Sequence, residues 1–323
     1  MRTMVIAHRG ASAIAPENTL SAFRAAHEIG ADGFETDVQL TKDGIPVISH
    51  DYSIDANSDG KGLIADMTLE ELMRYDFGSW KGERFKGERI VTLQECLEIG
   101  RTFDVINIEL KAPRDKGRPF AVPVADAIAS SGYSENIIVS SFQHSLLKEV
   151  KESHPEIKVG ALTIPQLPGE DELLDSCFPA DKPLDSITID DVTLPTDTAV
   201  LDKLCRMDGS DPRAAMLEMG HARGTIFPGM TPKRISEEVR RQADPCRYAN
   251  EIGFDLDYIH CDYTACLRDP SLIAKLHDLG LGVNVWTPDR EDDLRRLVAM
   301  GPDGIITNRP DILRRIIGLE CNG

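Results

Sequence analysis

Short apolar runs rich in β-branched residues alternate along this chain with segments of helical periodicity. Eight of the runs have the length of a buried strand, at residues 4–8, 33–39, 105–111, 137–141, 158–162, 256–261, 282–286 and 304–307. Strands separated by helices are typical of a parallel sheet assembled from β–α units. Eight such units predict an α/β fold, a (β/α)8 TIM barrel, whose functional residues lie at the C-terminal ends of the strands.

Two connections are too long for a minimal barrel. Residues 51–102 are a short insertion after the second strand, and the proline-rich residues 164–255 are a large insertion between the fifth and sixth strands. Without the large insertion the chain has 231 of its 323 residues, close to the roughly 250 of a typical barrel. We therefore expect one TIM-barrel domain over residues 1–323 that carries two insertions.

The large insertion leaves the fifth strand on the face where a barrel active site opens. We expect it to form a cap or a subunit contact and, as a cap, to limit access and select one side of the substrate. A surface elaboration remote from the site is the alternative. Candidate outer contacts are Arg206, Arg213, Arg223 and Lys233.

The charge balance narrows the partners of this chain. Asp and Glu number 54 against 36 Lys and Arg, a net charge of −18, which disfavours nucleic acid and anionic lipid. The apolar run at 4–7 is too short for a signal sequence, and no run has the length of a membrane span. Seven scattered cysteines without a CxxC pair predict a reducing, cytoplasmic location.

Because the net charge of the chain is negative, an anionic substrate would have to be neutralised by positive charge close to where it binds.

Carboxylates gather at the ends of two predicted barrel strands. Glu35 and Asp37 are two residues apart, so their side chains share one side of the strand, and Glu109 with Lys111 repeats this spacing. Three carboxylates inside a barrel repel one another and resist ionisation unless a positive charge lies among them. One hard divalent cation with oxygen ligands, Mg²⁺ or Ca²⁺, meets that need.

Two histidines are expected at the same barrel mouth. His8 follows the first strand, and His50 ends the strand-like run 46–50. Two imidazoles on opposite sides of a phosphodiester could share proton transfer, one taking a proton from the nucleophile and the other giving one to the leaving oxygen.

Seven short motifs occur in order along residues 4–317. They are His8-Arg9-Gly10, Ala15-Pro16-Glu17-Asn18-Thr19, Glu35-Thr36-Asp37-Val38, His50-Asp51, Glu109-Leu110-Lys111, Val285-Trp286-Thr287 and the stretch from Gly304 to Pro310. Together they resemble the glycerophosphodiester phosphodiesterase family. Each motif alone is weak, but seven in this order are specific. The region 164–255 has no counterpart, and Asn308 and Gln143 depart from the usual pattern.

The resemblance implies a metal-dependent phosphoric diester hydrolase of glycerol and lipid metabolism. Its substrates would be glycerophosphodiesters such as glycerophosphocholine or glycerophosphoethanolamine, and its products sn-glycerol 3-phosphate and an alcohol. It implies metal ligation by Glu35, Asp37 and Glu109, acid–base catalysis by His8 and His50, and phosphate binding by Arg9 and Lys111. Glu17, Asn18, Phe142 and Trp286 would support the site or contact substrate, with Asn18 also a candidate N-cap for the following helix.

Two other interpretations remain open on sequence alone. A related phosphodiester lyase would release a cyclic phosphate, because a neighbouring substrate hydroxyl could attack phosphorus. A barrel that binds without catalysis is a third class, although all of the expected charged residues are present. A homo-oligomer is also left open.

Overall fold

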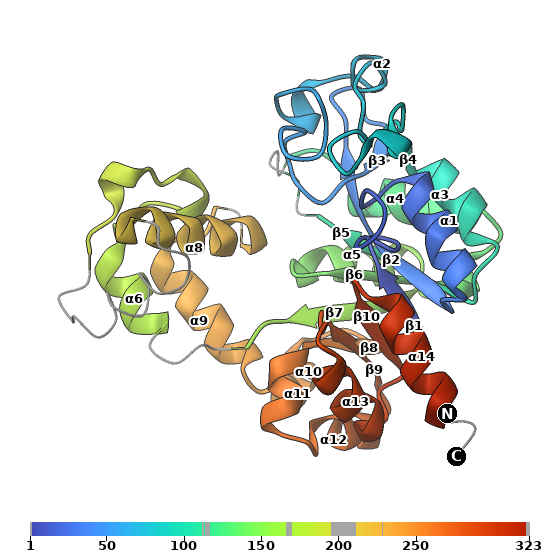
Figure 1. Ribbon diagram of the computed structural model, residues 1–323. Coiled ribbons are helices and arrows are strands. Elements are labelled where there is room, and N and C mark those ends of the chain that lie inside the picture. The colour runs from blue at the N-terminus through green and yellow to red at the C-terminus, as the bar shows by residue number, and fades with distance from the viewer. Residues whose placement is uncertain are drawn as a thin grey trace. The chain divides into compact units, whose positions relative to one another are not determined.

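The computed structural model describes residues 2–111, 113, 117–165, 170–194, 211–227 and 229–320. Its chain divides into two compact units (Figure 1), one of residues 1–163 and 249–323 and one of residues 164–248. The first unit contains the barrel, and the second follows the fifth barrel strand.

Within the described residues the barrel unit closes a ring of eight parallel strands. The ring consists of β1 (Met4–His8), β2 (Gly33–Leu40), β5 (Val105–Leu110), β6 (Ile137–Ser141), β7 (Lys158–Thr163), β8 (Tyr258–Asp262), β9 (Gly282–Trp286) and β10 (Gly304–Thr307). Pairing of β1 with both β10 and β2 closes it. The predicted TIM barrel is confirmed, and each ring strand falls within two residues of its predicted bounds.

The start of β8 differs from the prediction for a local reason. The strand was expected from residue 256, but it begins at Tyr258. The N–H of Asp257 donates to the carbonyl of Val159 at 3.1 Å, and the Asp257 carboxylate accepts from the N–H of Val159 at 2.8 Å. The carboxylate of Asp257 therefore accepts the hydrogen bond that a backbone carbonyl would accept in a regular strand pairing.

The connections of the barrel unit are mainly helical. They comprise α1 (Leu20–Ile29), α2 (Leu69–Leu72), α3 (Leu93–Gly100), α4 (Ala121–Ser130), α5 (His144–Ser153), α11 (Tyr263–Arg268), α12 (Leu272–Asp278), α13 (Glu291–Met300) and α14 (Pro310–Glu320). On α1 the buried residues Ala22, Phe23 and Ala26 recur at helical spacing, and the Phe23 ring stacks on Phe34 of β2 at 4.2 Å between centroids. This apolar stripe fixes the helix on the outside of the barrel.

The connection that follows β2 begins with a hairpin-like return, ahead of the predicted insertion at 51–102. β3 (Pro46–Ile48) pairs antiparallel with β2, and β4 (Val91–Thr92) pairs antiparallel with β3. The return strand carries the chain back along β2, so that the N–H of Ser49 donates to the carbonyl of Asp37 at 2.9 Å. The next residue, His50, is thereby brought back to the level of Asp37.

The lower part of the barrel interior holds an apolar cluster together with two buried polar side chains, His260 and Asn284. Ile6, Val105, Ile138 and Ile306 form one buried cluster. Each lies two or four residues before a polar residue of the mouth on the same strand face, as Ile6 does before His8. The apolar cluster therefore lies below the C-terminal mouth, where the charged side chains of the site collect.

The second unit is helical in its described part. It contains α6 (Glu170–Cys177), α8 (Pro212–Ile226) and α9 (Pro232–Gln242), and α10 (Pro245–Glu251) begins in it. A Cβ at Gly224 would lie 2.4 Å from the backbone nitrogen of Asp185, so this glycine permits close packing of α8. Of the candidate outer contacts, Arg213 and Lys233 are exposed, Arg223 is half-buried, and Arg206 lies outside the described residues.

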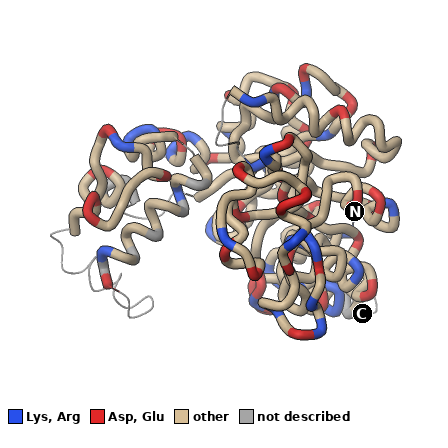
Figure 2. Tube along the Cα trace, turned by 90° about the horizontal axis from the view of Figure 1, so that it is seen from above, with Lys and Arg blue, Asp and Glu red and all other residues tan. Residues whose placement is uncertain are grey.

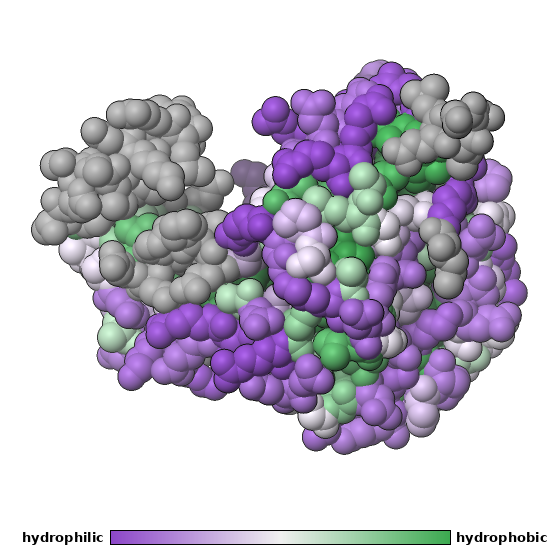
Figure 3. All heavy atoms as spheres, turned by 90° about the horizontal axis from the view of Figure 1, so that it is seen from below, coloured by the Kyte–Doolittle hydropathy of each residue, from purple (hydrophilic) through white to green (hydrophobic). Residues whose placement is uncertain are grey.

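Charge and polarity are spread over the barrel unit. Figure 2 shows acidic and basic residues interspersed along its trace. In the face shown in Figure 3, hydrophilic residues cover most of the barrel unit, with small hydrophobic areas between them. Among the helices that the structure describes, none combines the length and hydrophobicity needed to cross a bilayer.

Candidate active site

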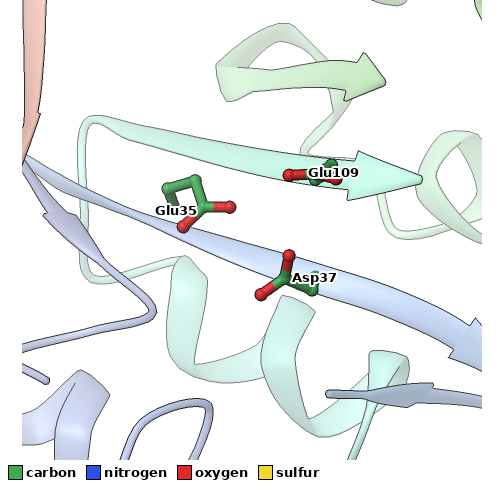
Figure 4. A group of neighbouring side chains, drawn as sticks. All are labelled: Glu35, Asp37 and Glu109. Carbon is green, nitrogen blue, oxygen red and sulfur yellow. The ribbon is translucent and has the colours of Figure 1, made fainter. Parts of the chain in front are cut away.

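Three buried carboxylates converge at the barrel mouth. Glu35 and Asp37 project from β2 and Glu109 from the neighbouring β5, so that all three point into one space (Figure 4). The register places Asp37 directly beside Glu109, and ligand oxygens from the three lie within 4.8 Å of one another. Only 4%, 1% and 8% of Glu35, Asp37 and Glu109 are exposed. The predicted juxtaposition of these residues is therefore present.

Two basic side chains lie among the carboxylates. The Nζ of Lys111 is 2.9 Å from Oε1 of Glu109 and 3.3 Å from Oδ1 of Asp37. Arg9 contacts Oε1 of Glu17 through Nη1 at 2.8 Å, and its Nε is 3.6 Å from Oδ2 of Asp37. Local positive charge therefore exists at the mouth of an acidic protein, as expected.

The three carboxylates are not electrostatically equivalent. Burial raises the pKa of Glu35 well above its ordinary value, and repulsion from Asp37 and Glu109 raises it further. Burial acts in the same direction on Asp37, but Lys111, His50 and Arg9 together hold the pKa of Asp37 below its ordinary value. Both basic side chains contact Asp37, and Glu35 is left as the carboxylate that most needs a further positive charge.

The loop after β1 holds two non-glycine residues in the left-handed region. Arg9 has φ 55° and Asn18 has φ 57°, a conformation that costs about 1 kcal/mol or more for such residues. In this conformation the N–H of Arg9 donates to Oε2 of Glu35 at 3.1 Å, and the N–H of Asn18 donates to the carbonyl of Arg9 at 3.0 Å. The left-handed turn at Arg9 thus directs one backbone donor at Glu35, and the N–H of Asn18 closes the loop onto Arg9.

The expected helix-capping role of Asn18 is wrong. Thr19 is the N-cap of α1, and its hydroxyl accepts from the N–H of Ala22 at 3.3 Å. Asn18 donates instead through Nδ2 to Oδ2 of Asp37 at 2.9 Å and accepts from the Thr36 hydroxyl at 2.7 Å. Its left-handed backbone turns the side chain toward β2, so it supports the carboxylate cluster.

His8 lies beside the carboxylates with a fixed ring orientation. Its Nε2 is 3.8 Å from Oε2 of Glu35, and its Nδ1 is 2.7 Å from Oδ1 of Asn308. Asn308 donates through Nδ2 to Oδ2 of Asp289 at 2.7 Å and through its backbone N–H to Oδ1 at 3.0 Å. A carboxylate accepts, so the amide nitrogen faces Asp289 and the amide oxygen faces His8. We infer that Nδ1 of His8 carries the proton and that Nε2 presents a lone pair.

The ring of His8 is neutral at physiological pH. Burial lowers its pKa to about 3, and the neighbouring Arg9 acts in the same direction, against the hydrogen bond to Asn308. A neutral imidazole with a free Nε2 is a proton acceptor.

His50 has a different partner. Its Nδ1 is 2.7 Å from Oδ1 of Asp51, and this hydrogen bond lowers the pKa of the Asp51 carboxyl. The two histidines therefore differ chemically, one with an amide partner and one with a carboxylate partner.

An aromatic pair completes the mouth. Phe142, just after β6, and Trp286, at the end of β9, meet edge to face with ring centroids 5.5 Å apart. Nε1 of Trp286 donates to the carbonyl of His260 at 2.9 Å, which fixes the indole. The structure thus brings the two predicted substrate-side aromatics into contact with each other.

Several supporting residues were missed from the sequence. Asn308 was noted only as a departure from the usual pattern, and Asp289, Ser12 and Gln39 were not singled out. Ser12 donates through its hydroxyl to Oδ1 of Asn308 at 2.7 Å. The one available signal was the position of Gln39, which continues the two-residue spacing of Glu35 and Asp37. Asp289 and Ser12 lie in loops, where sequence spacing predicts no side-chain contact.

The fold and this geometry together define a TIM barrel with a buried cluster of carboxylates, two histidines and two basic side chains at its mouth. A family model described as the glycerophosphoryl diester phosphodiesterase family matches residues 8–194 and 237–312. A glycerophosphodiester phosphodiesterase of Caldanaerobacter subterraneus is 46% identical over 163 residues, covering 50% of this chain and 67% of its own. YhdW of Bacillus subtilis, which has a provisional name of the same kind, is 42% identical over 313 residues, 96% of each chain.

A solved structure shares the fold. The Oleispira antarctica phosphodiesterase, determined in complex with the product sn-glycerol-3-phosphate, superposes with a TM-score of 0.64 at 23% identity, covering 97% of this chain and 96% of the other. The chain belongs to the glycerophosphoryl diester phosphodiesterase family and is a phosphoric diester hydrolase.

Proposed function

We propose that this protein hydrolyses glycerophosphodiesters such as glycerophosphocholine or glycerophosphoethanolamine to sn-glycerol 3-phosphate and an alcohol. The observation that carries the proposal is the convergence of three buried carboxylates, two differently partnered histidines and two basic side chains at one barrel mouth. The scattered cysteines support a reducing, cytoplasmic setting for the reaction.

The carboxylate cluster fits one divalent cation held by Glu35, Asp37 and Glu109. Oδ1 of Asp37 is buried and accepts no hydrogen bond from the described residues, its nearest cation among them being the Lys111 ammonium at 3.3 Å, and Glu35 resists ionisation in the absence of further positive charge. An all-oxygen donor set favours Mg²⁺ or Ca²⁺ over softer metals. When bound, such an ion would polarise a phosphoryl oxygen and offset negative charge that develops there.

His8 is the proposed proton acceptor. The hydrogen bonds that link Asp289, Asn308 and His8 fix the tautomer in which Nε2 is free, and burial keeps the ring neutral. In this role His8 removes the proton from the attacking hydroxyl or water, whichever reaches phosphorus first.

His50 is the proposed proton donor. The carboxylate of Asp51 occupies Nδ1, so Nε2 is the ring nitrogen that would deliver a proton to the departing alcohol oxygen. Two histidines with different hydrogen-bond partners thus divide the proton transfers of one displacement.

The remaining residues are assigned to substrate binding. Arg9 and Lys111 already contact the carboxylates and are placed to neutralise the phosphate that binds beside them. Glu17 orients the Arg9 guanidinium, and Asn18 holds Asp37. Phe142 and Trp286 present apolar ring surface to the glycerol or to the leaving alcohol.

Phosphorus NMR of the products tests the proposal. The purified protein is incubated with a panel of glycerophosphodiesters and Mg²⁺, Ca²⁺ or a chelator. We expect sn-glycerol 3-phosphate as the final product, with turnover lost on chelation. A stable cyclic phosphate would support the lyase interpretation. The absence of any product across the panel with either metal would instead favour a barrel that binds without catalysis.

A further inference from the structure

Gln39 makes an unusual contact with the segment that carries His50. It lies on β2 two residues beyond Asp37, on the same side of the strand, and is only 6% exposed. Its Nε2 lies 2.8, 3.1 and 2.8 Å from the carbonyl oxygens of Ser49, His50 and Asp51. Three carbonyl oxygens around one atom require a donor, so the amide nitrogen occupies this position.

This contact replaces regular structure in the segment. Ser49, His50 and Asp51 follow β3 and belong to no helix or strand. Besides the contacts from Gln39, the N–H of Ser49 connects this backbone to β2 by donating to the carbonyl of Asp37. The Ser49 hydroxyl donates within the segment, to the carbonyl of Asp51 at 3.2 Å. The side chain of Gln39 therefore anchors the backbone on both sides of His50 to the strand that bears Glu35 and Asp37.

We propose that Gln39 is a positioning residue that sets the place of the His50 imidazole relative to the carboxylate cluster. It acts through the His50 backbone and does not contact the substrate. The inference rests on the proposed function, in which His50 protonates the leaving alcohol. Loss of the amide donor would let the segment shift, and a displacement of about 1 Å can cost on the order of 10²-fold in rate.

The experiment compares two leaving groups. Gln39→Met keeps the length of the side chain but removes its donor, and Gln94→Met on the exposed face of α3 is the matched control. Rates are measured with glycerophosphocholine, whose alkoxide leaving group needs a proton, and with glycerophospho-p-nitrophenol, whose phenolate does not. We expect Gln39→Met to lower kcat about 10- to 100-fold on the first substrate and by less than about threefold on the second. KM and the metal-induced shift in Tm should stay unchanged.

The His50→Ala enzyme distinguishes a failure of the Gln39 inference from a failure of the proposed role of His50. If it shows the leaving-group split and Gln39→Met does not, the Gln39 inference is overturned and the proposed function stands. If His50→Ala loses the same factor on both substrates, the assignment of His50 as proton donor fails first. Should Gln39→Met not fold, Gln39→Asn, which draws the amide back by one methylene, should show the same split at smaller size, and equal losses on both substrates would overturn the inference.

Discussion

Removing one buried carboxylate should stabilise the metal-free protein and destabilise the metal-loaded protein. Glu35 is buried beside Asp37 and Glu109, and this environment raises its pKa. In Glu35→Gln the repulsion is relieved, because the amide is neutral and nearly the same size. The same change removes one of three proposed metal ligands, so the variant should lose turnover and the stabilisation that a divalent cation provides.

The sign of the pH dependence follows from the direction of the pKa shift. A carboxyl whose pKa is raised on folding contributes stability that is fully present below its unfolded pKa, about 4.3, and that is lost as pH rises through the folded value. The metal-free protein should therefore become less stable as pH rises above the ordinary glutamate range. Glu35→Gln should flatten that part of the profile.

The size of the metal effect follows from ligand linkage. A cation at 100 times its dissociation constant stabilises the folded state by about 2.7 kcal/mol. For a chain of 323 residues that corresponds to a rise in Tm of about 4 °C.

Thermal melts with and without Mg²⁺ or Ca²⁺, at several pH values, measure both effects. Glu152→Gln on the exposed part of α5 is the control and should behave as the unmodified protein. A Glu35→Gln variant that keeps the full metal-induced rise in Tm would refute the assignment of Glu35 as a ligand. A variant that is less stable than the parent without metal at pH 8 would refute the electrostatic reasoning.

The other site residues and the second unit yield further predictions. His8→Ala and His50→Ala should each lose about 10² to 10⁴ in rate with the fold intact, as steady-state kinetics and circular dichroism would show, and near-parental turnover in either would contradict its role. Arg9→Ala and Lys111→Ala should raise KM as well as lower kcat, because phosphate is bound in the ground state too; an unchanged KM in both would mean that they serve only the carboxylates. Replacing residues 164–248 by a Gly/Ser linker should broaden head-group preference or change the oligomeric state seen by light scattering, whereas a folded protein unchanged in both would speak for a remote surface elaboration.

The barrel was predictable because its signal is periodic. Short β-branched runs and helical stripes repeat around the ring, and the two-residue period of a strand puts Glu35 and Asp37 on one side of it. The ends of two adjacent parallel strands meet at one edge, which is why Glu109 could be expected beside them.

Loop geometry limited the rest of the prediction. The contact from Asp289 through Asn308 to His8 joins two loops to the first strand, and no spacing in the sequence indicates it. Asn18 was misassigned as a cap because asparagine is common there, whereas its left-handed backbone turns it toward Asp37. The antiparallel return of β3, which brings His50 into the site, depends on pairing that a three-residue run does not specify.

One divalent cation is proposed to bind among Glu35, Asp37 and Glu109, next to His8 and His50. A crystal of the protein grown with Mn²⁺ and measured at an anomalous wavelength tests it most directly. We predict one strong anomalous peak in contact with Glu35, Asp37 and Glu109, at metal–oxygen distances of about 2.0 to 2.6 Å, and its loss in Glu109→Gln. A peak at any other place, or none at a Mn²⁺ concentration that supports turnover, would contradict the account.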